Sequence, residues 1–323
     1  MATYKGIKGF NIQTVSSDPP APFVGEVWFN STSGTVKYRA DSTSAAWATG
    51  GNLTTGRRQA ASAGTQTSAV IFAGDYPNLV ATEEYNGASW TNGGNMATGR
   101  NSLAGGGTQT AALAFGGNGA QATTEEYNGS SWTNGGNLTT GRTSLAGGGT
   151  LTAGLAFGGA SYPPFVAQTG TEEYNGSSWT NVNAMNTGRY YIGGTGTQTS
   201  ALAFGGSPSG VTLNEEYNGT NWTNGGALNT GRQSIGGAGT EPAGLAFGGG
   251  LPDATAFNNT ESYNGTAWTN TTVMNVAKRY TAGCGTQAAA LSAGGQNDSS
   301  GTLSSTEEFN GAAPAATKTV GTD

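Results

Sequence analysis

The amino-acid sequence predicts an all-β protein that forms a six-bladed β-propeller. A phrase close to Glu-Glu-Tyr-Asn-Gly-x-x-Trp-Thr recurs along the chain, and most copies also carry an apolar run that ends in Gly-Gly. A basic residue opens each unit, at steps of 42 to 47 residues: Arg57, Arg100, Arg142, Arg189, Arg232 and Arg279. A period of about 40–50 residues with short strands and glycine-rich turns is typical of a propeller with one four-stranded blade per repeat.

One repeat, from Gly99 to Gly135, shows how a blade is expected to form. Residues 100–109 and 111–115 are predicted as the two inner strands, 125–127 as the third strand, and Trp132 as the start of the outer strand. Asn128-Gly129 predicts a tight hairpin turn, because both residues tolerate positive φ. Antiparallel order then places the loops after Gly-Gly and the connectors between blades on one face.

The two ends of the chain are predicted to share the last blade. The final copy reaches Phe309-Asn310-Gly311 and lacks its Trp strand, whereas Ala46–Leu53 matches Ser131–Leu138 without a preceding blade. We therefore expect residues 44–53 to complete the sixth blade and to cover its free edge. The predicted domains are an arm with a hairpin at 1–43, the propeller at 44–311 and a tail at 312–323.

Residues 44–311 resemble the kelch-type propellers. The resemblance rests on an apolar run ending in Gly-Gly, a Tyr and a Trp at short spacing, and an Arg that opens the next copy. It implies the propeller fold, and kelch domains mostly present loops to protein partners. Some kelch-like folds are copper oxidases with histidine ligands, but this chain has no histidine, so that activity cannot be carried over.

The N-terminal segment predicts a hairpin of residues 25–30 and 35–39 around a turn at 31–34, preceded by a stiff proline-containing linker at 18–22. The hairpin resembles a short element found in tail-fibre and other virion proteins of bacteriophages. That resemblance implies an attachment arm, while a hairpin packed on the propeller is the alternative. The aromatic residues expected to carry attachment are Phe10, Phe23, Trp28, Phe29 and Tyr38.

Repeated charged and aromatic residues are assigned to the scaffold. Paired carboxylates could serve glycoside hydrolysis, but sixfold repetition favours a belt of ion pairs between blades. The six arginines are predicted as partners of one acid of each pair, and in the five repeats that carry a pair this is the second acid: Glu84, Glu126, Glu173, Glu216 and Glu308. The remaining repeat carries Glu261 alone. The tryptophans are predicted as core between blades rather than as sugar-stacking platforms: Trp47, Trp90, Trp132, Trp179, Trp222 and Trp268.

The sequence predicts no catalytic residue, no metal site and no cofactor. Without histidine, Ser-His-Asp and Cys-His catalysis and His-ligated zinc are excluded. The single Cys284 takes a position where other repeats carry glycine or alanine and is expected to be a small buried residue. The net charge of −6 and the lack of a basic cluster argue against nucleic-acid binding, and no long apolar stretch or ordinary signal peptide is present.

The loops after the Gly-Gly pairs differ in every repeat, although the scaffold is nearly copied. Loops on a rigid scaffold are where recognition is usually built, and drift of exposed loops is the alternative. The predicted binding residues on this face are Tyr76, Asn78, Tyr162, Phe165, Asp253, Phe257 and Asp298.

These features together favour a non-enzymatic structural or adhesion protein of a bacteriophage particle, located in the virion. Residues 1–43 would contact other virion proteins or copies of the chain, and the propeller would face a host-surface glycan or protein. Two alternatives remain: a cellular or secreted glycan- or protein-binding module, exported without a classical signal, and a polysaccharide-acting enzyme.

Overall fold

A computed structural model of the chain describes residues 12–20, 26–39, 44–75, 78–208, 212–252, 255–299, 301–311 and 317–319. The predicted all-β class is confirmed, because every regular element in these residues is a strand. The chain divides into a large unit, Ala46–Asn310, and a terminal unit that joins Met1–Ala45 with Gly311–Asp323.

Within the described residues, the large unit contains six four-stranded antiparallel sheets and two short ribbons. The first sheet holds β5 (Ala61–Thr65), β6 (Ser68–Phe72), β7 (Thr82–Tyr85) and β8 (Trp90–Asn92). The second holds β9 (Ala104–Thr108), β10 (Ala111–Phe115), β11 (Thr124–Tyr127) and β12 (Trp132–Asn134). The third holds β13 (Ala146–Thr150), β14 (Ala153–Phe157), β17 (Thr171–Tyr174) and β18 (Trp179–Val182). The fourth holds β19 (Gly193–Thr197), β20 (Ser200–Phe204), β21 (Asn214–Tyr217) and β22 (Trp222–Asn224).

The fifth sheet holds β23 (Gly236–Thr240), β24 (Ala243–Phe247), β25 (Thr260–Tyr263) and β26 (Trp268–Asn270). The sixth holds β27 (Ala282–Gly285), β28 (Ala289–Ala293), β31 (Thr306–Asn310) and β4 (Ala46–Thr49). The ribbons are β15 (Ala160–Ser161) with β16 (Val166–Ala167), and β29 (Gln296–Asn297) with β30 (Gly301–Thr302).

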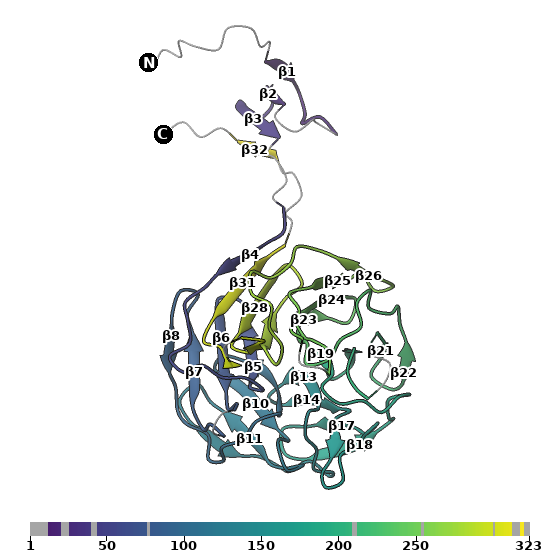
Figure 1. Cartoon of the computed structure of the whole chain (residues 1–323). Helices are drawn as coiled ribbons and strands as arrows, with labels where there is room; N and C mark the ends of the chain where they lie inside the picture. Colours follow the sequence, from purple (N-terminus) through teal and green to yellow (C-terminus); the bar gives the residue numbers. More distant parts are fainter. Residues whose placement is uncertain are drawn as a thin grey trace. The chain divides into compact units, whose positions relative to one another are not determined.

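The sheets succeed one another around a common centre in a propeller-like arrangement (Figure 1). The first strands β5, β9, β13, β19, β23 and β27 contact each other in that order, and β27 also contacts β5. Glycine allows this crowding, since a Cβ built on Gly106 would lie 2.9 Å from the backbone carbon of Gly148 in the next sheet.

The second sheet shows how far the predicted strand limits hold. Residues 111–115 form β10 as predicted, and the turn at Asn128-Gly129 is present, with Gly129 at φ +88°. The Asn128 side-chain oxygen accepts hydrogen bonds from the N–H groups of Ser130 and Ser131 at 3.0 and 2.9 Å. The first strand is shorter than predicted, because residues 100–103 turn away from the ladder before β9 begins.

The last sheet takes its outer strand from the N-terminal side of the chain. β4 pairs with β31 in antiparallel register, with Trp47 opposite Phe309, which is the pairing that the sequence predicts. The Trp47 ring lies 5.2 Å from Phe247 of the fifth sheet, and its Nε1 donates to Thr260 Oγ1 at 3.0 Å. The strand is therefore held by side-chain contacts as well as by its ladder.

The tryptophans lie between neighbouring sheets. Trp132 is representative: its Nε1 donates to Thr82 Oγ1 of the first sheet at 2.9 Å, and its ring centre lies 4.8 Å from that of Phe72. The ring centre of Tyr127, in the same sheet as Trp132, lies 4.9 Å from that of Trp132. Such pairs fill the space between sheets with apolar surface while the indole N–H keeps a threonine partner, except at Trp268, whose Nε1 is buried without one.

The terminal unit is a separate four-stranded sheet. It has the order β1 (Gln13–Val15), β2 (Val27–Asn30), β3 (Thr35–Arg39) and β32 (Thr317–Thr319), with β1 parallel to β2. The predicted hairpin is present, but β1 and β32 were not predicted. Of the predicted linker at 18–22, residues 21 and 22 lie outside the described residues, and Asp18 accepts hydrogen bonds from Lys37, Asn30 and Trp28 at 2.8 to 3.1 Å. These contacts lower the pKa of Asp18 to about 2.

Candidate binding site

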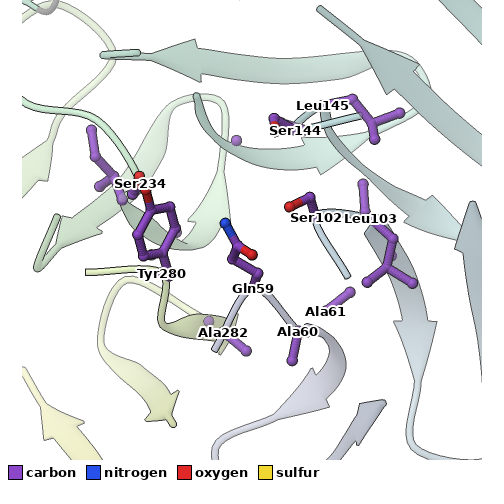
Figure 2. A pocket seen from close by; sticks show the side chains of 18 of the residues that line it. Gln59, Ala60, Ala61, Ser102, Leu103, Ser144, Leu145, Ser234, Tyr280 and Ala282 are labelled. Atoms are coloured by element: carbon purple, nitrogen blue, oxygen red, sulfur yellow. The ribbon is translucent and has the colours of Figure 1, made fainter. Parts of the chain in front are cut away.

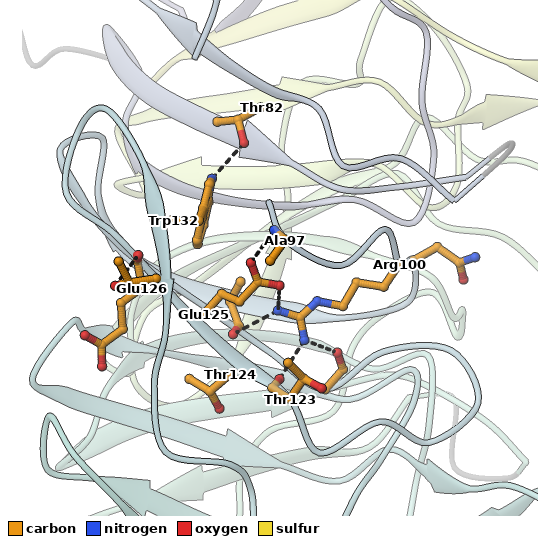
Figure 3. A network of polar contacts seen from close by, with 12 residues as sticks. Thr82, Ala97, Arg100, Thr123, Thr124, Glu125, Glu126 and Trp132 are labelled. Atoms are coloured by element: carbon orange, nitrogen blue, oxygen red, sulfur yellow. Dashed lines mark hydrogen bonds and ion pairs between the residues drawn. The ribbon is translucent and has the colours of Figure 1, made fainter. Parts of the chain in front are cut away.

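The first glutamate of each pair, rather than the second, meets the basic residue, which corrects the sequence prediction. Arg100 Nη2 lies 3.2 Å from Glu125 Oε1, and its other terminal nitrogen donates to the carbonyls of Gly116 and Thr123 at 2.9 and 2.6 Å (Figure 3). Both charged side chains are completely buried. The same pairs recur elsewhere: Arg57–Glu83, Arg142–Glu172, Arg189–Glu215 and Arg232–Glu261.

These ion pairs also hold the connector that enters each sheet. The Glu125 carboxylate accepts a hydrogen bond from the backbone N–H of Ala97 at 2.7 Å, so one acid ties both Arg100 and the incoming chain. The arginine and its acid belong to the same repeat, so the predicted belt of ion pairs between blades is wrong.

The second glutamate points to the opposite face of its strand, as Figure 3 shows for Glu126. It accepts a hydrogen bond from a tyrosine of the following sheet, and Tyr127 Oη donates to Glu84 at 2.6 Å. Burial, and then this bond, raise the pKa of Tyr127 to about 12. The other pairs are Tyr85–Glu308, Tyr174–Glu126, Tyr217–Glu173 and Tyr263–Glu216. Glu84, Glu126, Glu173, Glu216 and Glu308 thus connect sheets, but through tyrosines.

In the sixth sheet the basic partner is Lys278, not Arg279. The Lys278 Nζ atom lies 3.4 Å from Glu307 Oε1, and burial lowers the pKa of the lysine to about 8. Arg279 instead places its guanidinium carbon 5.3 Å from the ring centre of Tyr280. Lys278 therefore pairs with the buried glutamate, and the next residue, Arg279, packs on Tyr280. The Lys-Arg sequence by itself does not show which of the two takes which role.

A second set of bridges between sheets was missed. Gln109 Nε2 donates to the carbonyls of Ala69 and Tyr85 in the preceding sheet, at 3.0 and 2.7 Å. Gln66, Gln198 and Gln287 make the equivalent contacts. The recurring Thr-Gln pair was the signal that could have revealed them. The repeated acids and amides are therefore occupied in holding the scaffold.

A pocket of about 150 Å³ lies at one end of the first strands of the six sheets. Six equivalent residues line it, each placed just before the first strand of its sheet: Gln59, Ser102, Ser144, Tyr191, Ser234 and Tyr280. Figure 2 shows Gln59, Ser102 and Tyr280 surrounding one space. We call these six residues the rim.

All six rim residues have left-handed backbones, with φ between 50° and 57°. Their backbone N–H groups donate to the rim residue of the preceding sheet: Ser102 to Gln59 at 2.9 Å, and Gln59 to Tyr280 at 3.1 Å. The four other rim residues make the same contact at 2.8 to 3.0 Å. The backbones of the rim residues thus form a cycle of hydrogen bonds, and their side chains line the pocket.

Aromatic side chains gather on one side of the rim and break the sixfold repetition. The ring centres of Tyr191 and Tyr280 lie 5.5 Å apart, and Tyr190 lies 5.4 Å from Tyr191. Phe165, which is 42% exposed, packs edge-on against Tyr190 at 4.6 Å. Burial, and then the neighbouring Tyr280, raise the pKa of Tyr191.

The loop residues predicted to bind are only partly brought together. Phe165 joins the aromatic cluster, whereas Tyr162 is 58% exposed and Phe257 is half-buried. Asn78 accepts a hydrogen bond from Asn101 at 2.7 Å, and Asp298 accepts one from the backbone of Ala256 at 2.9 Å. Tyr76, Asp253, Phe10 and Phe23 lie outside the described residues.

Sequence reasoning missed Tyr191 and Tyr280, because they occupy positions where other repeats carry glutamine or serine. Tyr190 and Tyr191 follow the Arg189 that was assigned to the scaffold, and Tyr280 follows Arg279. The doubled Tyr190-Tyr191 was a visible departure from the repeat.

Of the predicted arm residues, Trp28 is fully buried in the terminal unit, while Phe29 and Tyr38 are half-buried.

Other site types find no support in the part of the chain that the structure describes. In those residues, no group of three or more His, Cys, Asp or Glu side chains is placed to hold a metal ion. No helix there is long and apolar enough to span a membrane. A second pocket, of about 130 Å³, lies at the other end of the first strands and is lined largely by glycine.

Comparison with known proteins shows the fold and no more. No protein-family model matches the chain, and no curated protein matches it. A solved structure entitled "Structure of YjhT" is similar, with a TM-score of 0.67 and 10% sequence identity. The similarity covers 79% of this chain and 95% of that one. The large unit thus shares an all-β, propeller-like architecture with a protein of very different sequence.

Proposed function

We propose that the large unit is a closed six-bladed propeller of the kelch type. Three observations support this proposal: the contact of β27 with β5, the pairing of β4 with β31, and the cycle of rim hydrogen bonds in which Gln59 donates to Tyr280. The repeat of Gly-Gly, Tyr, Trp and Arg supports the kelch assignment.

We propose that the protein is a non-catalytic adhesion component of a bacteriophage particle and binds a host surface through the rim face. The observation that carries this proposal is the departure from symmetry at the rim. The repeated acids are engaged by Arg, Lys and Tyr, as Glu125 and Glu126 illustrate, whereas Phe165, Tyr191 and Tyr280 gather in only part of the ring. A rigid scaffold with one distinctive face suits recognition better than chemistry.

The terminal unit is proposed to attach the propeller to the particle. Its hairpin resembles an element of virion proteins, and its own sheet is held together by the buried Trp28 and the hydrogen bonds to Asp18. Such a self-contained sheet can dock on other virion proteins or on further copies of the chain while the propeller keeps its own core.

Attachment is tested by building particles with a chain that begins at Ser44. This deletion removes the arm and hairpin but keeps β4. We expect the shortened protein to be absent from purified particles, whereas a full-length Tyr162→Ser variant is incorporated normally. Incorporation of the shortened chain at the normal level would refute the attachment role.

Adhesion is tested separately with the purified full-length protein. Added in excess to host cells, it is expected to slow adsorption of intact particles because both compete for one surface ligand. Unchanged adsorption, with the added protein folded and not retained by the cells, would refute the adhesion role.

A further inference from the structure

We propose that the rim is a saccharide subsite that accepts one neutral pyranose ring of a host-surface glycan. This inference rests on the proposed adhesion role and specifies its ligand. It is carried by the backbone conformation of the rim, by the chemistry of its side chains and by an unpartnered buried hydroxyl.

The backbone of the rim favours glycine, yet no rim residue is glycine. Left-handed φ values are unfavourable for residues with a Cβ, and such strain tends to be kept at functional sites. The other end of the same strands offers an internal comparison. There, six equivalent residues with positive φ are all glycine: Gly64, Gly107, Gly149, Gly196, Gly239 and Gly285.

The two ends differ in what a side chain would meet. At the glycine end, a Cβ would lie 2.1 to 2.3 Å from a backbone oxygen, so only glycine fits. At the rim, side chains face a pocket instead. The cycle of rim hydrogen bonds uses only backbone groups, and glycine would make it with less strain. The backbone cycle therefore does not itself require Gln, Ser or Tyr at these positions, and the scaffold bond from Ser102 Oγ to Asn101 Oδ1, at 2.9 Å, has no equivalent at the unpartnered Ser234 Oγ.

The side chains that line the pocket are polar but uncharged. Gln59, Ser102, Ser144 and Ser234 offer amide and hydroxyl groups, and Tyr191 and Tyr280 add phenols. The Ser234 Oγ atom is buried without a hydrogen-bond partner, and the residue is only 7% exposed. A buried polar group without a partner in a native site calls for a ligand or a water molecule.

The aromatic side of the rim selects among polar ligands. Tyr191 and Tyr280 place ring surface beside the hydroxyls, and Phe165 extends that surface toward solvent. A pyranose has an apolar C–H face that packs on an aromatic ring and hydroxyls that bond to Ser and Gln. The pocket lining itself contains no Lys or Arg side chain to pair with an anion, and Arg279 packs beside Tyr280 without belonging to the lining. A neutral saccharide therefore fits this lining best.

The test uses the full-length protein and immobilised oligosaccharides that end in glucose, galactose, mannose, N-acetylglucosamine or glucuronate. We expect binding to at least one neutral terminus. The variants Ser102→Gly/Ser234→Gly and Tyr191→Ser should each weaken that binding by about tenfold or more. Both changes use residues that suit a left-handed backbone or already occur in the rim, so thermal unfolding midpoints should stay close to that of the unmodified protein. Tyr162→Ser, outside the pocket lining, is the matched control and should bind normally.

Three results would overturn the saccharide subsite: no binding to any neutral terminus, binding to glucuronate alone, or equal binding by the rim variants. The adsorption assay keeps the two proposals apart. If the rim variants still compete with particles for host cells, adhesion stands and the subsite is wrong. If the unmodified chain does not compete at all, the adhesion role itself fails.

Discussion

Each buried arginine of the scaffold is matched to one carboxylate and to backbone carbonyl groups, as Arg100 is to Glu125, Gly116 and Thr123. Arg100 and Glu125 are fully buried, so their charges are compensated only by each other and by the groups drawn around them in Figure 3. Removing one partner of such a pair leaves an isolated charge in a medium that solvates it poorly. This makes the pair indispensable once it is present, whatever its net contribution to stability.

We predict that Arg100→Met lowers the free energy of unfolding by about 3–5 kcal/mol, because Glu125 loses its buried partner. The matched control is Arg58→Met. Arg58 pairs with Asp75 at 2.9 Å, but both side chains are partly exposed, so the expected loss is about 1 kcal/mol or less. Urea unfolding of both variants measures the difference, and equal losses would contradict the role given to burial.

Among the six buried ion pairs, the pair of Lys278 with Glu307 is expected to be the weakest. Lys278 offers a single ammonium group, whereas the other five sheets use the forked guanidinium of an arginine. Its pKa is lowered to about 8 by burial, from an ordinary value of 10.5. Between these values the unfolded chain holds a proton that the folded chain has released, so the contribution of Lys278 to stability rises with pH across this window. Below pH 8 the full cost of burying the ammonium is present.

Lys278→Arg is therefore predicted to stabilise the fold by about 2 kcal/mol at pH 7, through hydrogen bonds to charged groups like those of Arg100. The gain should shrink as the pH rises from 8 toward 10, because the unmodified protein loses the penalty of its charged lysine. Thermal or urea unfolding of both proteins across pH 6–10 checks this. A gain that grows with pH would contradict the assignment.

At the scale of elements, β4 is the strand of the large unit whose position depends on the most distant pairing. It covers the edge of β31, and Trp47 fills the space next to Phe247 of the fifth sheet. An uncovered β31 would expose unpaired N–H and C=O groups and the apolar surface that Trp47 buries.

A chain that begins at Ser44 is predicted to unfold as cooperatively as the full protein, whereas one that begins at Thr54 loses β4 and should aggregate. We expect the second chain to be less stable by at least about 3–5 kcal/mol, the usual loss when a buried tryptophan is removed. Unfolding curves and light scattering distinguish the two. Equal stability would show that β4 does not support the sixth sheet.

At the scale of the whole molecule, Cys284 reports on the junction between the first and last sheets. Its Sγ atom lies in β27, 3.9 Å from the carbonyl oxygen of Thr65 in β5. Burial raises the pKa of the thiol to about 12, and the thiolate is the form that reacts with alkylating reagents.

We predict that iodoacetamide leaves Cys284 unmodified in the native protein at pH 8 and modifies it rapidly in urea. A chain that begins at Thr54 should react without denaturant, because loosening the sixth sheet opens this junction. Mass spectrometry over time gives the rates. Rapid modification of the native full-length chain would mean that the two sheets do not stay together.

Much of this fold can be predicted from short-range patterns in the sequence. The bounds of β10 and the Asn128-Gly129 turn follow from apolar runs and turn chemistry, which act over a few residues. Alternation along β11 also shows that Glu125 and Glu126 face opposite sides. The alternation does not show which face of the strand meets Arg100. For that reason the sequence prediction paired the arginine with the wrong glutamate. The pairing of β32 with β3 was missed because a strand of three residues has no recognisable pattern.

Strand order, turn positions and the match between Ala46–Leu53 and the later repeats can all be inferred from the order of residues, because each depends on local propensity or on internal repetition. The rim and its aromatic cluster cannot. Phe165, Tyr191 and Tyr280 come from three separate repeats and meet only where the first strands converge, since their proximity depends on how the sheets pack around the centre. Repetition in the sequence accounts for the scaffold, whereas packing of the sheets brings these three aromatic residues of different repeats together.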